Sequence, residues 1–250
     1  MTLRLPLLPT DPRAPFPDPR AALRVPDGLL AMGGDLSPPR LLNAYRHGIF
    51  PWYSEGEPLL WWCPDPRTVF RTDAVRLSSR FRRSLRRSDW IVRADTAFTR
   101  VIDACATLPR GGQLGTWITV EMREAYVELH RLGHAHSIEV FAADELVGGL
   151  YGVAIGRMFF GESMVSIRSG GSKVALAALC ARLHQWGWPL LDAQVENPHL
   201  LSLGAELWPR ERFLGALPEL VAQQGNPGTW STGFGEYPVR HLAGTDVAGA

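Results

Sequence analysis

The spacing of hydrophobic residues changes from helical to strand-like along the middle of the chain. In Thr119–Leu132 the apolar residues recur at helical spacing, and Thr119 followed by Glu121 suits the start of a helix. Apolar stretches rich in β-branched and aromatic residues come next, separated by short turn sequences, which predicts consecutive strands. These predicted strands are His136–Ala142, Leu146–Ile155 and Met158–Ser166.

Further elements flank these strands. Ser172–Trp186 carries leucines along one helix face, and the apolar run Leu190–Val195 predicts a buried strand. Nearer the start of the chain, Ser37 and Pro38 form a typical beginning for a helix that ends at His47. We also predict a helix at Ser78–Ser88 and strands at Leu59–Trp62 and Asp89–Arg93.

The order of these elements indicates the fold class. Helices, a meander of strands and then helix, strand, helix predict an α+β domain with one mixed sheet. This order resembles the acetyltransferase-like (GNAT) architecture. We divide the chain into an extended Pro-rich arm (1–20), a small N-terminal domain (21–70), a GNAT-like catalytic domain (71–222) and a loose tail rich in Gly, Pro and Thr (223–250).

Composition excludes several classes of protein. The chain has 250 residues, 46% of them hydrophobic and 20% charged, which is enough to form a core and is unlike a disordered chain or a fibre. No apolar run approaches the roughly 18 residues of a membrane span, and nothing near the start resembles an export signal. Cys63, Cys105 and Cys180 show no metal or disulfide spacing, so we expect reduced structural cysteines in a cytoplasmic protein.

Arginines cluster on the predicted helix 78–88 with few acids among them. Between Arg76 and Arg93 the single acid is Asp89, and Lys173 is the one lysine of the chain. Such a surface suits the phosphate backbone of a nucleic acid, and a lysine at a helix start suggests a need for a compact point charge. A solvated basic helix without a partner is the alternative. The candidate residues are Arg80, Arg82, Arg83, Arg86, Arg87 and Lys173.

Polar residues interrupt two apolar strands. Alternation places Glu162 on one face of its strand together with Phe160 and Met164. On the strand that follows the helix 172–186, Asp192 and Gln194 share a face, and Leu191 and Ala193 point away from it. Polar groups at these positions cost free energy unless they are paired or line a cleft. A carboxylate and an amide aimed together are able to orient a nucleophile; a structural carboxylate or a solvent-facing strand end are the alternatives.

Two further motifs concern ligands. Arg168–Lys173 leads into a helix and nearly matches the loop by which acetyltransferases hold a pyrophosphate on backbone amides, although Lys173 stands where that loop has Gly or Ala. Tryptophans such as Trp52 and Trp117 lie in Gly- and Pro-rich contexts, where indole rings are able to stack on a nucleic-acid base or to pack between domains. His134 and His136 have no further ligands near them, so we expect no metal.

Taken together, nine stretches resemble the bacterial leucyl/phenylalanyl-tRNA–protein transferase family. They follow one another in order from about residue 20 to residue 215, and as a set they are highly specific. The sequence departs from the family pattern at Gly170–Gly171 and at Ala193. The matching stretches are 28–38, 45–52, 61–67, 115–118, 134–139, 146–152, 161–164, 192–194 and 202–205.

The resemblance implies an activity and its partners. It implies a GNAT-like domain that no longer uses coenzyme A, with no cofactor, and transfer of Leu, Phe and less readily Met from aminoacyl-tRNA. The acceptors are proteins that begin with Arg or Lys, which then enter N-terminus-dependent degradation. No membrane and no DNA partner is expected.

The resemblance also implies roles for individual residues. Trp52 and Trp117 are expected to flank the terminal adenosine of the tRNA. Glu162, Asp192 and Gln194 are expected at the reaction centre. Separately, the spacing of Asp192 and Gln194 on one strand face leads us to expect the attacking amine between them. The apolar residues around the amino-acid side chain are expected to be Leu150, Phe159, Met164, Leu176, Leu183 and Leu191.

Two other classes of protein stay open on the residues alone. A coenzyme A-dependent acetyltransferase is favoured by Arg168–Lys173 and by the inferred fold. A tRNA-binding module without catalysis is favoured by the arginine cluster, but it leaves Glu162, Asp192 and Gln194 without a purpose.

Overall fold

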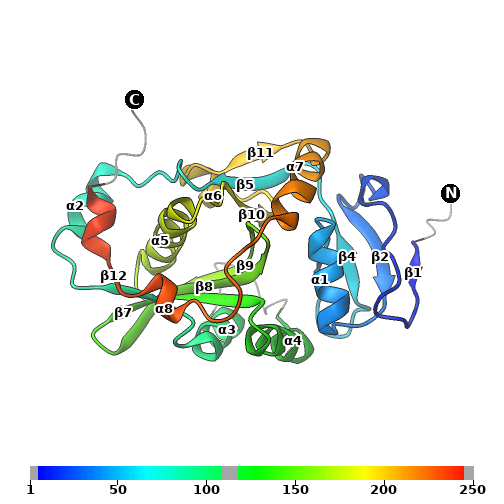
Figure 1. The fold of residues 1–250 in the computed structure, drawn as a ribbon, viewed down its shortest axis with the longest axis horizontal. Helices are drawn as coiled ribbons and strands as arrows, with labels where there is room; N and C mark the ends of the chain where they lie inside the picture. Colours follow the sequence, from blue (N-terminus) through cyan, green and yellow to red (C-terminus); the bar gives the residue numbers. More distant parts are fainter. Residues whose placement is uncertain (1–4, 109–117, 245–250) are drawn as a thin grey trace.

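The computed structural model describes residues 5–108 and 118–244 and contains two sheets (Figure 1). The smaller sheet has four strands in the order β1-β2-β4-β3 and belongs to the N-terminal part of the chain. The elements there are β1 (Leu7–Leu8), η1 (Pro19–Ala21), β2 (Leu29–Gly33), α1 (Pro38–Arg46), β3 (Phe50–Pro51) and β4 (Leu60–Trp62).

The larger sheet has eight strands in the order β11-β5-β10-β9-β8-β7-β6-β12. Its first elements are β5 (Arg67–Arg71), α2 (Ser79–Leu85), β6 (Ile91–Ala94), α3 (Phe98–Thr107), α4 (Val120–Arg131), β7 (Ala135–Ala142), β8 (Glu145–Ile155) and β9 (Met158–Ser166). They are followed by α5 (Gly171–Gln185), β10 (Leu190–Gln194), α6 (Pro198–Ser202), β11 (Glu206–Trp208), α7 (Arg210–Ala222), α8 (Ser231–Phe234), β12 (Tyr237–Pro238) and η2 (Val239–Ala243).

Helices cover both faces of the larger sheet. Helix α5 packs on one face, and α3 and α4 pack on the other, where α1 of the N-terminal part also lies (Figure 1). Every neighbouring pair in this sheet is antiparallel except β9 and β10, which run parallel because α5 connects them as a crossover. The order of elements and the parallel pair give the predicted α+β fold with a mixed sheet and an acetyltransferase-like architecture.

Most of the predicted elements in the catalytic part are confirmed within a few residues. Thr119 caps α4, because its hydroxyl accepts the backbone N–H of Met122 at 3.3 Å. Pro38 begins α1 as predicted, with Ser37 in the capping position. The three cysteines are buried and free, as expected. No helix among the described residues is both long enough and apolar enough to cross a membrane.

The ends of the predicted domains need correction. Arg67–Arg71 pairs with β10 and β11 and therefore belongs to the larger sheet, not to the N-terminal domain. The arm is tied down, since Leu7 and Leu8 pair with β2 and the Arg40 guanidinium donates to the carbonyl oxygens of Pro9 and Asp11.

The tail predicted to be loose is folded as far as residue 244. β12 pairs with β6 at the edge of the sheet. Trp230 is buried against His136, with ring centroids 3.8 Å apart, and its backbone N–H donates to Asp95 at 2.7 Å. The packing of a few apolar residues therefore folds this segment, although its composition favours turns.

Candidate functional site

A small cavity opens where β9 and β10 separate. The two strands are paired through Met158–Phe160 and Leu190–Asp192, and the pairing ends there. β9 continues beside β8, so its later residues diverge from the end of β10. The cavity has a volume of about 100 Å³ and is lined by Phe70, Leu150, Tyr151, Phe159, Gly161, Glu162, Ser163, Met164, Leu176, Leu191, Ala193, Gln194 and Leu200.

The apolar part of this lining largely matches the residues expected around a substrate side chain. Leu150, Phe159, Met164, Leu176 and Leu191 line the cavity. Leu183 does not, because it lies about two helical turns beyond Leu176 and is buried in the core between α5 and the sheet. Phe70, Tyr151 and Leu200 complete the wall without having been predicted.

β-Bulges change which side chains share a face at this site. The register of β8 and β9 shifts next to Glu162, so alternation inverts along β9. Phe160 packs in the core on the α3 and α4 side, whereas Met164 packs on the α5 side, so the prediction that they share a face is wrong. Leu191 and Ala193 share a face, as alternation predicts, but that face lines the cavity, so the prediction that Ala193 faces away from the site is wrong. A second shift, between Asp192 and Gln194, brings Gln194 to the same cavity and separates it from Asp192.

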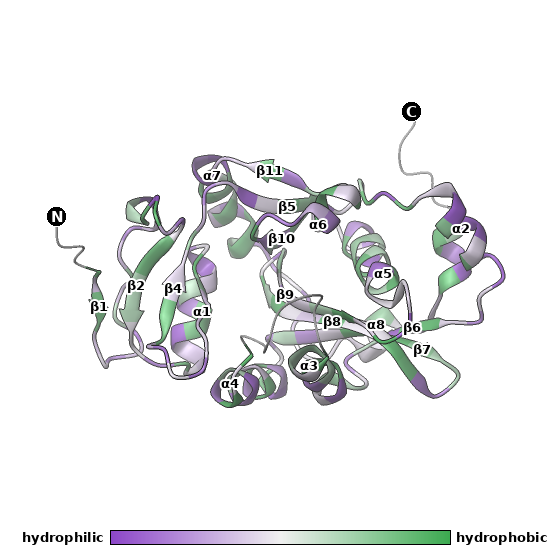
Figure 2. Ribbon diagram, turned by 180° about the vertical axis from the view of Figure 1, so that it is seen from behind, coloured by the Kyte–Doolittle hydropathy of each residue, from purple (hydrophilic) through white to green (hydrophobic). Residues whose placement is uncertain are grey.

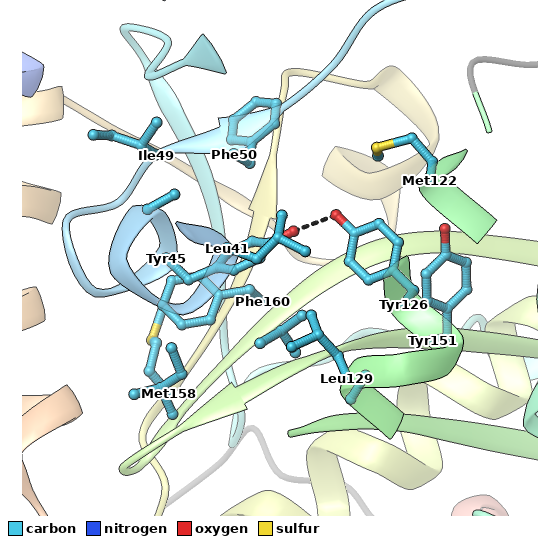
Figure 3. Packing of buried hydrophobic residues seen from close by; sticks show 14 of the residues in the cluster. Leu41, Tyr45, Ile49, Phe50, Met122, Tyr126, Leu129, Tyr151, Met158 and Phe160 are labelled. Carbon is cyan, nitrogen blue, oxygen red and sulfur yellow. Dashed lines mark hydrogen bonds between the residues drawn. The ribbon is translucent and has the colours of Figure 1, made fainter. Parts of the chain in front are cut away.

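Glu162 lies at the polar end of the cavity and accepts hydrogen bonds from three elements. The hydroxyl of Tyr45 on α1 donates to Oε1 at 2.7 Å, and that of Tyr126 on α4 donates to Oε2 at 2.8 Å. Gln194 Nε2 on β10 donates to Oε1 at 2.6 Å. The two tyrosines point toward each other, with their hydroxyl oxygens in contact (Figure 3). Because each hydroxyl has a single proton, a hydrogen bond between them requires that one of them accepts from a protonated Glu162 instead of donating to it. The N-terminal part of the chain therefore contributes directly to this site.

Burial controls the ionisation of Glu162. It raises the pKa of the carboxyl group to about 7, even though the hydrogen bonds from Tyr45, Tyr126 and Gln194 act in the opposite direction. The nearby carboxylate of Asp192 adds to the rise in pKa. Near neutral pH the Glu162 side chain is therefore partly protonated, and its charge changes over a range of pH in which enzymes work.

Asp192 is completely buried and paired with Arg67. Its Oδ1 accepts from Arg67 Nε at 2.8 Å, and its Oδ2 accepts from Arg67 Nη2 at 2.6 Å. The sequence predicted that Asp192 and Gln194 border one cleft with an amine between them. Only Gln194 lines the cavity, because the bulge separates the two side chains and Asp192 faces Arg67.

Gln194 has a backbone conformation that is uncommon for a residue with a side chain. Its φ is +62°, in the left-handed region, at the point where β10 ends. The backbone N–H of Gln194 donates to Asp192 Oδ1 at 2.9 Å. Because Nε2 faces the Glu162 carboxyl group, the other end of the amide, Oε1, is directed away from it.

The arginines of α2 form a basic surface at the end of the molecule far from β1, where the ribbon is hydrophilic at many positions (Figure 2). Arg80, Arg83, Arg86 and Arg87 are exposed, and Arg82 is half-buried. Lys173, in the first turn of α5, has its amine 5.7 Å from the ring centroid of Phe81 on α2. Lys173 thus connects α2, which carries the predicted arginines, to the start of the helix whose Leu176 lines the cavity.

The glycines of the acetyltransferase-like loop have a packing role. A Cβ on Gly171 would lie 2.3 Å from the carbonyl oxygen of Val147, and one on Gly148 would lie 2.5 Å from Cα of Gly171. The start of α5 therefore touches the backbone of β8 so closely that no side chain fits between them. This close packing explains why Gly171 is a glycine, so the residue is not evidence for a pyrophosphate-binding loop.

Of the two tryptophans predicted to stack on a base, Trp52 lies within the described residues. Trp52 follows β3, is 40% exposed and lies against Trp62, with ring centroids 5.6 Å apart. Its neighbour Tyr53 contacts the hydroxyl of Thr119 at 3.1 Å, which links the N-terminal part to the start of α4. Trp117 lies outside the described residues.

Sequence reasoning missed three residues that contact the predicted reaction centre: Tyr45, Tyr126 and Arg67. Tyr126 carries a hydroxyl on an otherwise apolar helix face, and Arg67 precedes an apolar strand. A buried carboxylate needs a donor or a cation, so these isolated polar groups were the available signal.

Comparison with known proteins identifies the family. A family model described as leucyl/phenylalanyl-tRNA protein transferase matches residues 69–218, and the model of its N-terminal domain matches residues 34–65. A leucyl/phenylalanyl-tRNA–protein transferase of Xanthomonas euvesicatoria pv. vesicatoria (strain 85-10) is 70% identical over 239 residues, 96% of each chain. Another, of Xylella fastidiosa (strain 9a5c), is 62% identical over 236 residues, 94% of this chain and 97% of that one.

Two solved structures with a similar arrangement are distant in sequence. A functionally unknown conserved protein from Staphylococcus epidermidis gives a TM-score of 0.41 at 9% identity, over 72% of this chain and 68% of that one. A GCN5-related N-acetyltransferase-like protein from Streptococcus suis gives 0.29 at 12% identity, over 64% and 59%. These TM-scores are too low to assign the fold, which is assigned from the order of the elements and the sheet topology instead.

The two family models together cover most of the chain, and the relatives match it across nearly its whole length. The alignments with these relatives, at 62% and 70% identity overall, cover both the N-terminal part and the part that forms the cavity. The chain therefore belongs to the leucyl/phenylalanyl-tRNA–protein transferase family and is an enzyme that moves an aminoacyl group from tRNA to a protein.

Proposed function

We propose that this enzyme transfers leucine or phenylalanine, and methionine less readily, to acceptor proteins whose first residue is Arg or Lys. The transfer takes place in the cytoplasm and marks the acceptors for N-terminus-dependent degradation. The donor is the aminoacyl ester at the 3′ end of the tRNA, and the acceptor is the α-amine of the protein.

The observation that carries this proposal is an apolar cavity that ends at a polar centre. Its wall offers Met164, Leu191 and Phe159 to an apolar side chain, and its polar end offers Glu162 and Gln194. A wall of this kind provides size and dispersion but few polar groups that discriminate. Large side chains that are unbranched or branched at Cγ therefore fit this cavity. Val and Ile fit poorly, because their bulk lies at Cβ.

The reaction is aminolysis of an ester. The neutral α-amine attacks the ester carbonyl, a C–N bond forms, and the C–O bond to the ribose breaks. The amine loses a proton and the ribose oxygen gains one. An α-amine has an ordinary pKa of about 7.7–8.0, so a useful fraction is neutral near pH 7. Holding the two substrates in contact contributes roughly 7–11 kcal/mol in well-oriented cases.

Gln194 and Glu162 have different tasks in this proposal. Gln194 Oε1 is directed away from Glu162 and accepts a hydrogen bond from the attacking amine. Glu162 supplies negative charge toward the basic first residue of the acceptor. Asp192 stands behind Gln194 and acts on its orientation, because Asp192 is fully buried and its two oxygens are occupied.

Binding of the tRNA requires a separate surface. We assign its backbone to Arg80, Arg82, Arg83, Arg86, Arg87 and Lys173, and its terminal adenosine to Trp52 and Trp117. Lys173 at the start of α5 contacts Phe81 of α2, and Leu176 on the same α5 helix lines the cavity. This contact supports a path for the tRNA from α2 along α5 toward the cavity.

The activity itself is tested by incubating the enzyme with radiolabelled aminoacyl-tRNA and a peptide that begins with Arg. Leucyl- and phenylalanyl-tRNA should give labelled peptide readily and methionyl-tRNA more slowly, since apolar discrimination by one methylene amounts to about 1–3 kcal/mol. A matched peptide that begins with Ala is the control and should stay unlabelled. Efficient transfer from valyl-tRNA, or equal use of both peptides, would contradict the proposal.

The charge of Glu162 predicts a pH dependence. The fraction of carboxylate rises by about tenfold between about pH 6 and pH 8, because burial places the pKa of this group at about 7. The ratio of kcat/KM for an Arg-initiated peptide, wild type over Glu162→Gln, should therefore rise over this range, by at most about tenfold. Titration of the acceptor amine cancels in the ratio. A ratio that is flat with pH would show that the ionised form of Glu162 has no part in the use of the acceptor.

The basic surface predicts a change in salt dependence. Replacing the exposed Arg80, Arg83, Arg86 and Arg87 with Ala should weaken tRNA binding and lower the slope of log affinity against log salt. Each lost phosphate contact should remove about 0.7–0.9 from the slope. Arg131→Ala, at an exposed arginine on α4, is the matched control and should leave the slope unchanged. An unchanged slope in the quadruple variant would mean that the cluster is only a solvated helix face.

A further inference from the structure

The guanidinium group of Arg67 is buried at the junction of the two parts of the molecule. Its side chain has no exposed surface, and its Cζ lies 4.9 Å from the ring centroid of Phe50 and 4.7 Å from that of Phe213. Phe50 belongs to β3 of the N-terminal part, and Phe213 belongs to α7. Two aromatic rings therefore fix the position of a cation that cannot reach solvent.

The contacts of Arg67 continue through Asp192 to the backbone of Gln194. The planar fork of Arg67 holds both oxygens of Asp192, at 2.8 and 2.6 Å. Held in this way, Asp192 Oδ1 accepts the backbone N–H of Gln194 at 2.9 Å. Each link is buried, so water does not compete for any of these hydrogen bonds.

The hydrogen bond from the backbone N–H of Gln194 to Asp192 stabilises an uncommon backbone conformation of Gln194. A residue other than glycine at φ +62° is in a sparsely populated region and persists only where its surroundings determine it. That conformation ends β10 and turns the side-chain amide of Gln194 toward Glu162, 2.6 Å away. If Asp192 rotated, Gln194 would lose the contact that holds its backbone, and its amide would no longer be directed at the polar end of the cavity.

We propose that Arg67 is a positioning residue for aminoacyl transfer, which acts through Asp192 on the backbone of Gln194. Arg67 touches no substrate, since it is fully buried and does not line the cavity. The inference rests on the proposed function, because it assumes that the Gln194 amide serves the transfer reaction. It adds a residue that is not part of the cavity but sets the geometry at its polar end.

A second buried arginine provides a matched control. Arg210 is 6% exposed, and its Nη1 donates to the carbonyl oxygens of Pro19, Ala22 and Cys63. It ties the N-terminal part to α7, as Arg67 does, but none of these contacts involves Glu162, Asp192 or Gln194. Loss of Arg210 should therefore affect stability without affecting the reaction centre.

The test compares Arg67→Lys with Arg210→Lys. Lysine keeps the charge but is a point donor that cannot bridge both oxygens of Asp192. Single-turnover transfer is measured with saturating leucyl-tRNA and an Arg-initiated peptide, at a temperature at which melting curves show each variant to be folded. Arg67→Lys should lower the rate by up to about 100-fold, as expected for a misplaced reacting group. Its Kd for leucyl-tRNA should stay within about twofold of wild type.

Arg210→Lys should lower the melting temperature but keep the wild-type rate. The double variant Arg67→Lys/Gln194→Ala should be no slower than Gln194→Ala alone, because Arg67 acts only through Gln194. If Arg67→Lys does not fold, Arg67→Gln, which is neutral and retains a planar donor, takes its place in both comparisons.

Three results would overturn the positioning role: a wild-type rate in Arg67→Lys, an equal loss of rate in Arg210→Lys, or a double variant slowed by the product of the two single effects. These results differ from failure of the proposed function, in which the wild-type enzyme itself would transfer no leucine to the peptide.

Discussion

The site depends on satisfying one buried carboxylate. Glu162 is 8% exposed and would be costly in this position without hydrogen-bond donors. Its donors come from α1, α4 and β10, which are far apart in the sequence and meet only in the folded chain. The position of the N-terminal part against the larger sheet is therefore coupled to the polar end of the cavity through Tyr45. In this fold the N-terminal part is a component of the site and not an appendage.

A second constraint comes from the sheet. β9 and β10 are neighbours over a short parallel stretch and then diverge, which opens a cavity between them. The bulge beside Glu162 and the left-handed Gln194 both occur where the pairing ends, so they turn polar side chains toward the space left by the missing pairs. The walls of the cavity stay apolar because β8, β9 and α5 present core side chains there. An apolar cleft closed by an ionisable centre suits a substrate with an apolar side chain and a reactive ester.

Sequence patterns predicted most of the catalytic part because its elements are long and periodic, as in α4, β8 and α5. They failed where a local event changed the pattern. Alternation put Asp192 and Gln194 on one face and Ala193 on the other, but a shift of register between Asp192 and Gln194 separates these two and places Gln194 with Ala193 in the cavity lining. The tail was predicted to be loose from its glycines and prolines, yet Trp230 and Tyr237 anchor it. Arg67, Tyr45 and Tyr126 were missed because their hydrogen-bond partners are distant in sequence, so isolated polar residues were visible but their pairing was not.

In the proposed reaction the cavity between β9 and β10 holds the side chain of the transferred amino acid, with the carbonyl of that amino acid at Gln194. The most direct test is a crystal structure of the enzyme with a non-hydrolysable 3′-amide analogue of phenylalanyl-adenosine. We expect the phenyl ring between Met164 and Leu191, and the carbonyl carbon of the analogue beside the Gln194 amide. An analogue bound with its ring outside this cavity, or with its carbonyl remote from Gln194 and Glu162, would contradict the account.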